Sequence, residues 1–262
     1  MRDPHVVALH YRLVTGETLA FKNAPPVERA TEAFRLRLAD DRLAVEMKEH
    51  YATERQATEQ VEPDLRAWEI DVALREEPGF MRFIFERAEV VDRNPPPPRT
   101  DQALQVGLKE VMIFGETVSV RITRAQYPEP PGEFVISPDV ETMWRRYEGY
   151  RAGKEPLAAM AYMCLTVLEA SAGGRKNKRG KAARQYSVDA EVLSTLGHLT
   201  TEVGDAQTAR KVICGRKLRP HTSAEISWIE GVIKALIRRA GEWTANPNAA
   251  RPRITLKEFS PI

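Results

Sequence analysis

The hydrophobic residues of this chain change their repeat near its middle, and this change limits the folds that the chain can adopt. Up to about Val140, apolar residues recur at every second position, which is the spacing of a strand with one buried face. From Glu141 onward they recur at spacings of three and four, which indicates amphipathic helices. We therefore predict an α+β protein with an antiparallel β-sheet domain containing one helix, followed by a basic α-helical bundle.

The charge of the chain changes sign where the repeat changes. Residues 1–140 hold 18 Lys and Arg against 25 Asp and Glu, whereas the remaining residues hold 21 against 12. The formal net charge of the whole chain is only +2, so the average conceals a basic helical half. A basic surface of this kind favours an anionic partner.

Composition predicts a globular protein of the cytoplasm. Apolar residues make up 42% of the chain, the mean hydropathy is −0.42, and no apolar run approaches the roughly 20 residues that a membrane helix needs. The two cysteines, Cys164 and Cys214, are not spaced as metal ligands. We expect no membrane contact, and the sequence predicts neither a metal site nor a cofactor.

The first predicted domain covers residues 1–130. Its clearest hairpin has alternating apolar residues from Phe34 to Leu38 and from Leu43 to Met47, with Asp40-Asp41 as the turn. Charged residues between them indicate a solvent-exposed face, as in an antiparallel sheet that is covered on one side. The pattern of alternation returns around Met81–Phe85 and again at Val118, Val120 and Ile122.

One helix is predicted near residues 61–75 of this domain. Val61, Leu65, Trp68 and Val72 lie on one helical face, and Pro63 is expected in the first turn, where its missing N–H costs nothing. Trp68 should therefore be buried against the sheet.

The second predicted domain covers residues 137–262. Ser137-Pro138 has the composition of a helix start, and the segment 157–170 is apolar on all sides, which predicts the central helix of the bundle. Ser187 is the expected cap of a third helix. Thr222 and Glu225 form a capping-box pattern before the last helix, whose apolar stripe leaves Trp228 one position outside and partly exposed.

A glycine-flanked loop at residues 173–186 is the first candidate nucleic-acid contact. The loop is rich in Lys and Arg, which bind phosphates by releasing counterions and need no special spacing to do so. Tyr186 at its end could stack on a base. The alternative is a solvated basic loop. The loop contains six cations and no acid: Arg175, Lys176, Lys178, Arg179, Lys181 and Arg184.

A second basic cluster precedes the last helix. This cluster leads into Pro220-His221 and is the second candidate nucleic-acid contact. The alternative interpretation is an exposed segment in which His221 only precedes a helix cap. The cations of this cluster are Arg210, Lys211, Arg216, Lys217 and Arg219.

The segment from Arg216 to His221, together with the apolar helix around residues 165–169, resembles the HEPN domains. These are small helical bundles of ribonucleases and their inactive relatives, and the active ones carry an Arg and a His separated by four to six residues near the start of a late helix. The resemblance covers about the last 120 residues. It implies Arg216 and His221 as catalytic residues of a metal-independent ribonuclease.

We predict a cytoplasmic protein that binds nucleic acid, RNA more than DNA, through its helical half. Residues 1–130 are expected to bind a protein partner, and an oligomer is possible. Two alternatives stay open: a metal-independent HEPN-like ribonuclease, and a structural or assembly subunit in which the opposite charges of the two halves organise self-association.

Overall fold

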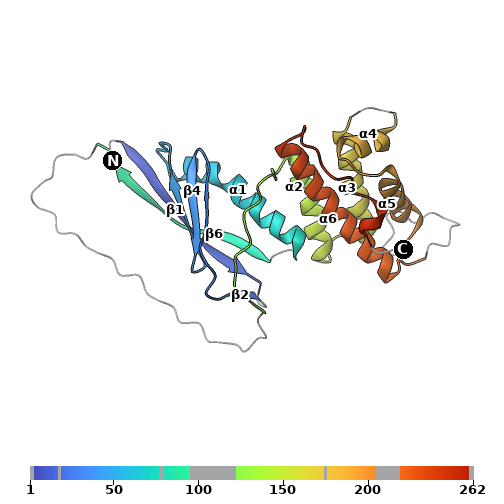
Figure 1. The fold of residues 1–262 in the computed structure, drawn as a ribbon, viewed down its shortest axis with the longest axis horizontal. Helices are drawn as coiled ribbons and strands as arrows, with labels where there is room; N and C mark the ends of the chain where they lie inside the picture. The colour runs from blue at the N-terminus through green and yellow to red at the C-terminus, as the bar shows by residue number, and fades with distance from the viewer. Residues whose placement is uncertain are drawn as a thin grey trace, which may run out of the picture. The chain divides into compact units, whose positions relative to one another are not determined.

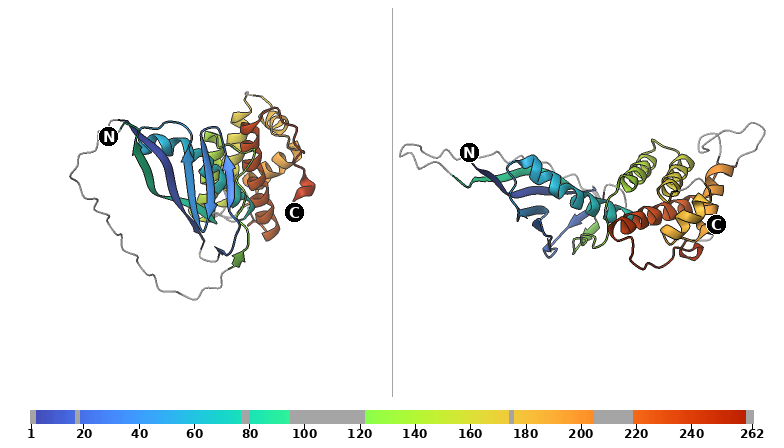
Figure 2. Two further views of the ribbon diagram at one scale, coloured as in Figure 1. Left: turned by 60° about the vertical axis from the view of Figure 1, so that its left-hand side comes forward. Right: turned by 90° about the horizontal axis from the view of Figure 1, so that it is seen from above.

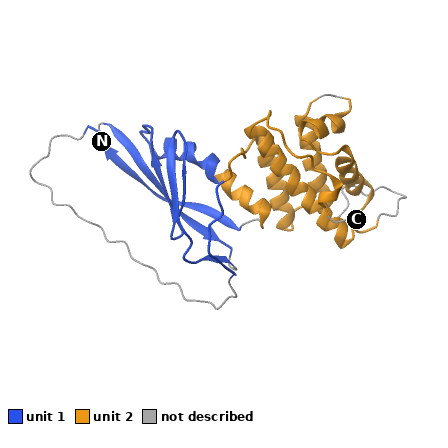
Figure 3. Cartoon of the chain, viewed as in Figure 1, with its two compact units in different colours: residues 1–65, 79–130 blue, residues 66–78, 131–262 orange. Residues whose placement is uncertain are grey.

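A computed structural model describes residues 3–16, 19–76, 80–94, 122–173, 176–204 and 219–259. The chain divides into two compact units, unit 1 (residues 1–65 and 79–130) and unit 2 (residues 66–78 and 131–262) (Figure 3). The ranges expected from the sequence differ from these units in the assignment of residues 66–78. The predicted α+β class is confirmed, because a five-stranded antiparallel sheet and six α-helices make up most of the described chain (Figure 1).

Unit 1 is built on an antiparallel sheet with the strand order β3-β4-β5-β1-β6. Its strands are β1 (Pro4–Thr15), β3 (Val27–Ala30), β4 (Phe34–Ala39), β5 (Arg42–Met47) and β6 (Met81–Asp92). A separate pair, β2 (Leu19–Phe21) and β7 (Ile122–Arg124), is parallel. Ile122 therefore lies in a strand, but this strand is outside the antiparallel sheet. Val118 and Val120 lie outside the described residues.

The hairpin β4–β5 forms as predicted, with Asp40 and Asp41 as its two turn residues. Their φ angles are +50° and +56°, which is the left-handed pair that a tight type I′ turn requires. Tyr127 anchors this turn, because its hydroxyl accepts a hydrogen bond from the Asp41 amide at 2.9 Å and donates one to the Asp41 carboxylate at 3.0 Å.

The first part of helix α1 (Glu54–Arg75) covers one face of the sheet (Figure 2). Two contacts link this part of α1 to the sheet. Arg29 on β3 pairs with Asp64 on α1 at 4.0 Å. On β1, burial together with the nearby Glu62 of α1 raises the pKa of the Tyr11 hydroxyl to about 12. The opposite face carries ion pairs, such as Arg12 with Glu86 at 3.4 Å, as the alternation predicts.

Helix α1 is longer than its apolar stripe indicates. It begins at Glu54, where the Thr53 hydroxyl accepts a hydrogen bond from the Gln56 amide at 3.3 Å, so Pro63 lies inside the helix and not in its first turn. The buried Ala57 extends the stripe but is too small to mark it in the sequence. Trp68 is fully buried as predicted, with 0% exposure, but it belongs to the end of α1 that unit 2 contains.

Unit 2 is a helical bundle around one apolar core. Its further helices are α2 (Pro138–Arg151), α3 (Leu157–Ser171), α4 (Lys178–Gln185), α5 (Ala190–Glu202) and α6 (Ser223–Ala245), followed by a 3₁₀ turn η1 (Leu256–Glu258). Helix α3 packs against α2, α4, α5 and α6, so the prediction that it is the central helix is confirmed. The end of α1 contributes Ile70 and Leu74 to the same core.

The helix starts in unit 2 are partly as predicted. The Ser137 hydroxyl caps α2, and Thr222 with Glu225 forms the capping box of α6. Ser187 is not a cap: it has a φ of +49°, and α5 follows Asp189. Trp228 is also not exposed, since only 2% of it is accessible and Phe259 of the returning C-terminal segment packs edge-on against its ring.

Candidate nucleic-acid interface

The segment predicted as a basic loop contains a short helix, α4, so the prediction of a loop over residues 173–186 is wrong. Ala182 and Ala183 are buried, and α4 packs against α3 and α5. Eight residues are too few to hold a helix in water without such packing. The sequence shows no apolar repeat here because two alanines provide the whole buried surface.

The side chain of Arg179 is 40% exposed, but its guanidinium is held by an ion pair to a neighbouring helix. Its Nε donates to the Glu169 carboxylate on α3 at 2.9 Å. A Cβ at Gly197 on α5 would lie 2.8 Å from the Arg179 guanidinium, so this glycine makes room for the side chain. Arg179 therefore joins three helices.

The remaining cations of α4 lie on its other side. Lys178, Lys181 and Arg184 follow one another at intervals of three residues, which places them along one face of the helix. We call these three residues the α4 stripe. Lys178 and Arg184 are exposed and Lys181 is half-exposed, and none of them has an ion-pair partner among the described residues.

Such a stripe is unfavourable for an isolated helix. Like charges three residues apart repel one another, and α4 has no acidic residue in its first turn to offset the positive end of the helix dipole. The exposed Lys176 just before α4 adds to this charge. An anion bound at this face would relieve the repulsion, which is the chemistry of phosphate binding.

Tyr186 cannot provide the base-stacking surface that its position suggested. Only 3% of it is exposed, and its ring meets Trp243 of α6 at a centroid distance of 5.6 Å. The residue packs into the core at the end of α4.

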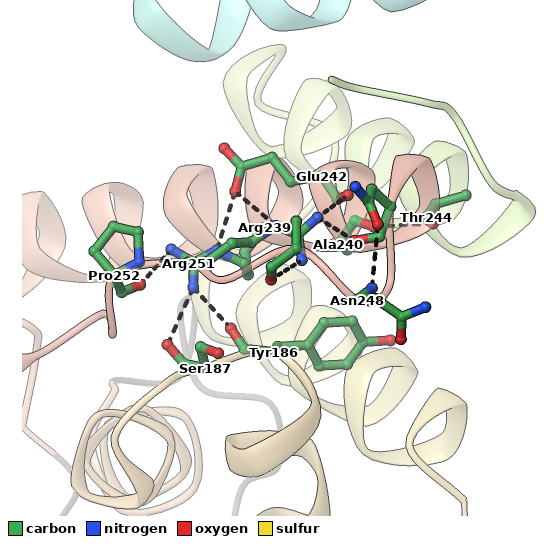
Figure 4. A network of polar contacts seen from close by, with 11 residues as sticks. Tyr186, Ser187, Arg239, Ala240, Glu242, Thr244, Asn248, Arg251 and Pro252 are labelled. Carbon is green, nitrogen blue, oxygen red and sulfur yellow. Dashed lines mark hydrogen bonds and ion pairs between the residues drawn. The ribbon is translucent and has the colours of Figure 1, made fainter. Parts of the chain in front are cut away.

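Arg239 holds this end of α4 in place (Figure 4). Its guanidinium donates to the carbonyl oxygens of Tyr186 at 3.0 Å, Ser187 at 3.1 Å and Pro252 at 2.9 Å, and it pairs with Glu242 at 3.1 Å. A positive charge at the C-terminal carbonyls of a helix also complements the helix dipole. This role could not be predicted from the sequence, because the carbonyl groups that Arg239 contacts belong to distant segments and every residue has such a group.

Arg219, the one described cation of the second cluster, is committed to a local partner. Its guanidinium donates to both oxygens of Glu225, at 2.7 Å and 2.5 Å, although the arginine side chain is 56% exposed. Hydrogen bonding from Arg219, with help from the Thr222 amide and against the effect of burial, lowers the pKa of Glu225 to about 2. The charge of Arg219 is therefore largely balanced by Glu225 in the protein without a ligand.

This ion pair predicts a specific acid sensitivity. Since the pKa of Glu225 is lowered from its ordinary 4.5 to about 2, its contribution to stability is complete above about pH 4.5 and is lost as the pH falls towards 2. Urea unfolding across this range should show a steeper loss of stability for the natural chain than for Glu225→Gln or Arg219→Ala. Parallel curves for all three would show that the pair contributes nothing in solution.

His221 is fixed by the backbone of α5. Its Nε2 lies 3.1 Å from the carbonyl oxygen of Leu199, which can only accept, so Nε2 carries a proton. Nδ1 is buried without a hydrogen-bond partner among the described residues. A general base needs a lone pair within reach of its substrate, and the nitrogen that could supply one faces inward.

Both predicted clusters lie against the same helix, α5. Arg179 of the first lies beside Gly197, and His221 at the end of the second contacts the carbonyl oxygen of Leu199. The other predicted site residues, namely Arg175, Arg210, Lys211, Arg216 and Lys217, lie outside the described residues. In the part of the chain that the structure describes, no helix is long and apolar enough to cross a membrane, and no three His, Cys, Asp or Glu side chains are grouped to hold a metal ion.

No family model matches this chain, and neither a curated protein nor a solved structure matches it. The resemblance to HEPN domains therefore stays a prediction from the residues.

Proposed function

We propose that unit 2 binds nucleic acid, RNA in preference to DNA, through phosphate contacts made by the α4 stripe. The observation that carries this proposal is that Lys178, Lys181 and Arg184 form a row of cations to which no described residue supplies a counter-charge. Most other arginines of unit 2, among them Arg145, are already in ion pairs. The preference for RNA rests on the resemblance to HEPN domains.

The contributions of the predicted cations are unequal in this proposal. Lys176 and the α4 stripe supply the principal contacts, whereas Arg179 and Arg219 contribute less because Glu169 and Glu225 already balance them. Arg175, Arg210, Lys211 and Lys217 are further contacts predicted from the sequence alone.

The test is a pair of matched double charge reversals, measured by fluorescence anisotropy with a labelled RNA. Lys178→Glu with Lys181→Glu should weaken binding at least about tenfold near 0.1 M salt. The slope of log K against log salt should become shallower by about 1.4 to 1.8, since each lost phosphate contact removes about 0.7 on a single strand and about 0.9 on a duplex. An acidic residue suits the first turn of α4, so the fold should persist.

The control is Lys154→Glu with Lys257→Glu, which changes the net charge equally at two exposed lysines of unit 2 outside α4. We expect only a small loss of affinity from it. Equal losses from both variants would mean that net charge, and not the α4 stripe, determines binding.

The ribonuclease alternative would need His221 to act as a base. This role requires the Nδ1 atom of His221 to become accessible, and Arg216 to lie beside the imidazole. In this alternative, cleavage resists EDTA and disappears in His221→Ala while RNA binding is retained, because that change removes a catalytic group and little positive charge. Binding without cleavage in the natural chain would leave the α4 stripe as a binding surface alone.

A partner-binding role for unit 1 is the second component of the proposal, with a second copy of the chain as the partner. Four large apolar side chains are exposed on its sheet: Val14 on β1 at 37%, and Ile84, Val90 and Val91 on β6 at 45%, 37% and 44%. The two halves of the sequence also carry opposite charges. Sedimentation velocity should show concentration-dependent association that is weaker in Ile84→Glu. A monomer at all concentrations would contradict self-association.

A further inference from the structure

The aromatic side chains of unit 2 are turned inward. Among its described residues no Phe, Tyr or Trp is exposed, and Trp144, Tyr147, Tyr186 and Trp228 are each at most 3% accessible. The half-buried rings are also engaged: Trp243 packs on Tyr186, and the Tyr150 hydroxyl donates to Glu230 at 2.7 Å. The exposed imidazole on α5, His198, is paired with Glu202 at 3.6 Å.

A site without an exposed ring cannot use the main source of affinity for single strands. Proteins that bind single-stranded nucleic acid stack bases on aromatic side chains, and each stacked base is worth about 1–3 kcal/mol. The α4 stripe offers only charge. Its affinity must therefore follow the density of phosphates in the ligand.

Phosphate density is highest in a double helix. A duplex carries about one charge per 1.7 Å of its axis, and each phosphate contact releases about 0.9 counterions, compared with about 0.7 for a single strand. The stripe itself is short: successive cations are about 4.5 Å apart along the helix axis and turned by about 60° around it, so the three span about 9 Å along the axis and about 120° around it. A ligand with closely spaced phosphates on a stiff surface can contact all three cations of the α4 stripe at once.

We propose that the α4 stripe takes the sugar-phosphate backbone of a double-helical nucleic acid, without contacting base edges. This inference rests on the proposed function, and it names the class of ligand for the same surface. RNA and DNA duplexes share the required chemistry. Sequence should have little effect on affinity, because contacts made to phosphates carry no sequence information.

The experiment compares an RNA duplex, a DNA duplex and an unstructured single-stranded RNA of equal phosphate count, each with the full chain. Near 0.1 M salt we expect the duplexes to bind about fourfold more tightly than the single strand, because about 0.2 more counterion is released at each of about three contacts. The RNA duplex should bind at least as tightly as the DNA duplex, as the proposed preference for RNA requires. Tighter binding of the DNA duplex would contradict that preference while retaining the duplex site.

The double variant Lys178→Glu with Lys181→Glu separates the two proposals. If the single strand binds as tightly as the duplexes and this variant still abolishes binding, the α4 stripe binds nucleic acid but the preference for duplexes is wrong. If the variant affects none of the three ligands, both the ligand class and the proposed function of the stripe are wrong. If the natural chain prefers duplexes and the variant loses duplex binding, the result supports both the nucleic-acid-binding role of the α4 stripe and its preference for duplexes.

Discussion

Arg239→Ala is expected to lower the free energy of unfolding of unit 2 by about 3–5 kcal/mol. Arg239 is 7% exposed, and its removal leaves the carbonyl oxygens of Tyr186 and Pro252 without their donor, while that of Ser187 keeps only the Ile254 amide at 2.9 Å. Buried acceptors that lose a charged donor bear the full cost of their desolvation. Urea unfolding followed by tryptophan fluorescence measures the change.

Two further variants sharpen this test. Arg239→Lys should also be destabilising, because a lysine cannot donate along the several directions of the guanidinium. Arg253→Ala is the control: its side chain is 64% exposed and pairs with Asp189 at 3.4 Å, so it should cost at most about 1 kcal/mol. Equal effects of Arg239→Ala and Arg253→Ala would show that the carbonyl network does not stabilise the unit.

Trp68→Ala is expected to cost a similar amount, about 3–5 kcal/mol, because it opens a cavity at a fully buried position of α1. The change also removes the largest apolar side chain of this helix. Thermal or urea unfolding measures the loss. Val135→Ala, at a 47% exposed position of unit 2, should stay within about 0.5 kcal/mol of the natural chain. A Trp68→Ala variant as stable as Val135→Ala would contradict the packing of this helix.

The elements that sequence predicts well are those whose pattern is local. Alternation identified β4 and β5, and the Asp40-Asp41 turn follows from the need for two left-handed residues. The composition of α3 predicted its central position, because a helix without a polar face must be buried on all sides.

The errors concern contacts between distant parts of the chain. Trp228 lies outside the apolar stripe of α6, and only the return of Phe259 buries it. Helix α4 has no hydrophobic repeat, so its existence depends on neighbouring helices. A local pattern contains no information about either contact.

The candidate site shows the same limit. Sequence located the α4 cations but could not say which were available, since Glu169 lies ten positions before Arg179 and on another helix. The carbonyl acceptors of Arg239 could not be foreseen, because backbone oxygen is present at every residue. The availability of a cation is a property of the folded neighbourhood.

The division of α1 between the two units has a consequence for folding during synthesis. The ribosome delivers the chain in the order unit 1, unit 2, unit 1, unit 2, because residues 66–78 belong to unit 2 and residues 79–130 return to unit 1. Ile70 and Leu74 therefore emerge long before α2 to α6, which provide the rest of their core. Until α2 to α6 have been synthesised, this stretch of α1 exposes apolar surface of the kind that nascent chains need chaperones to protect. For the same reason a fragment beginning at Pro131 lacks part of its core and should aggregate, whereas one beginning before Glu54 retains the whole helix.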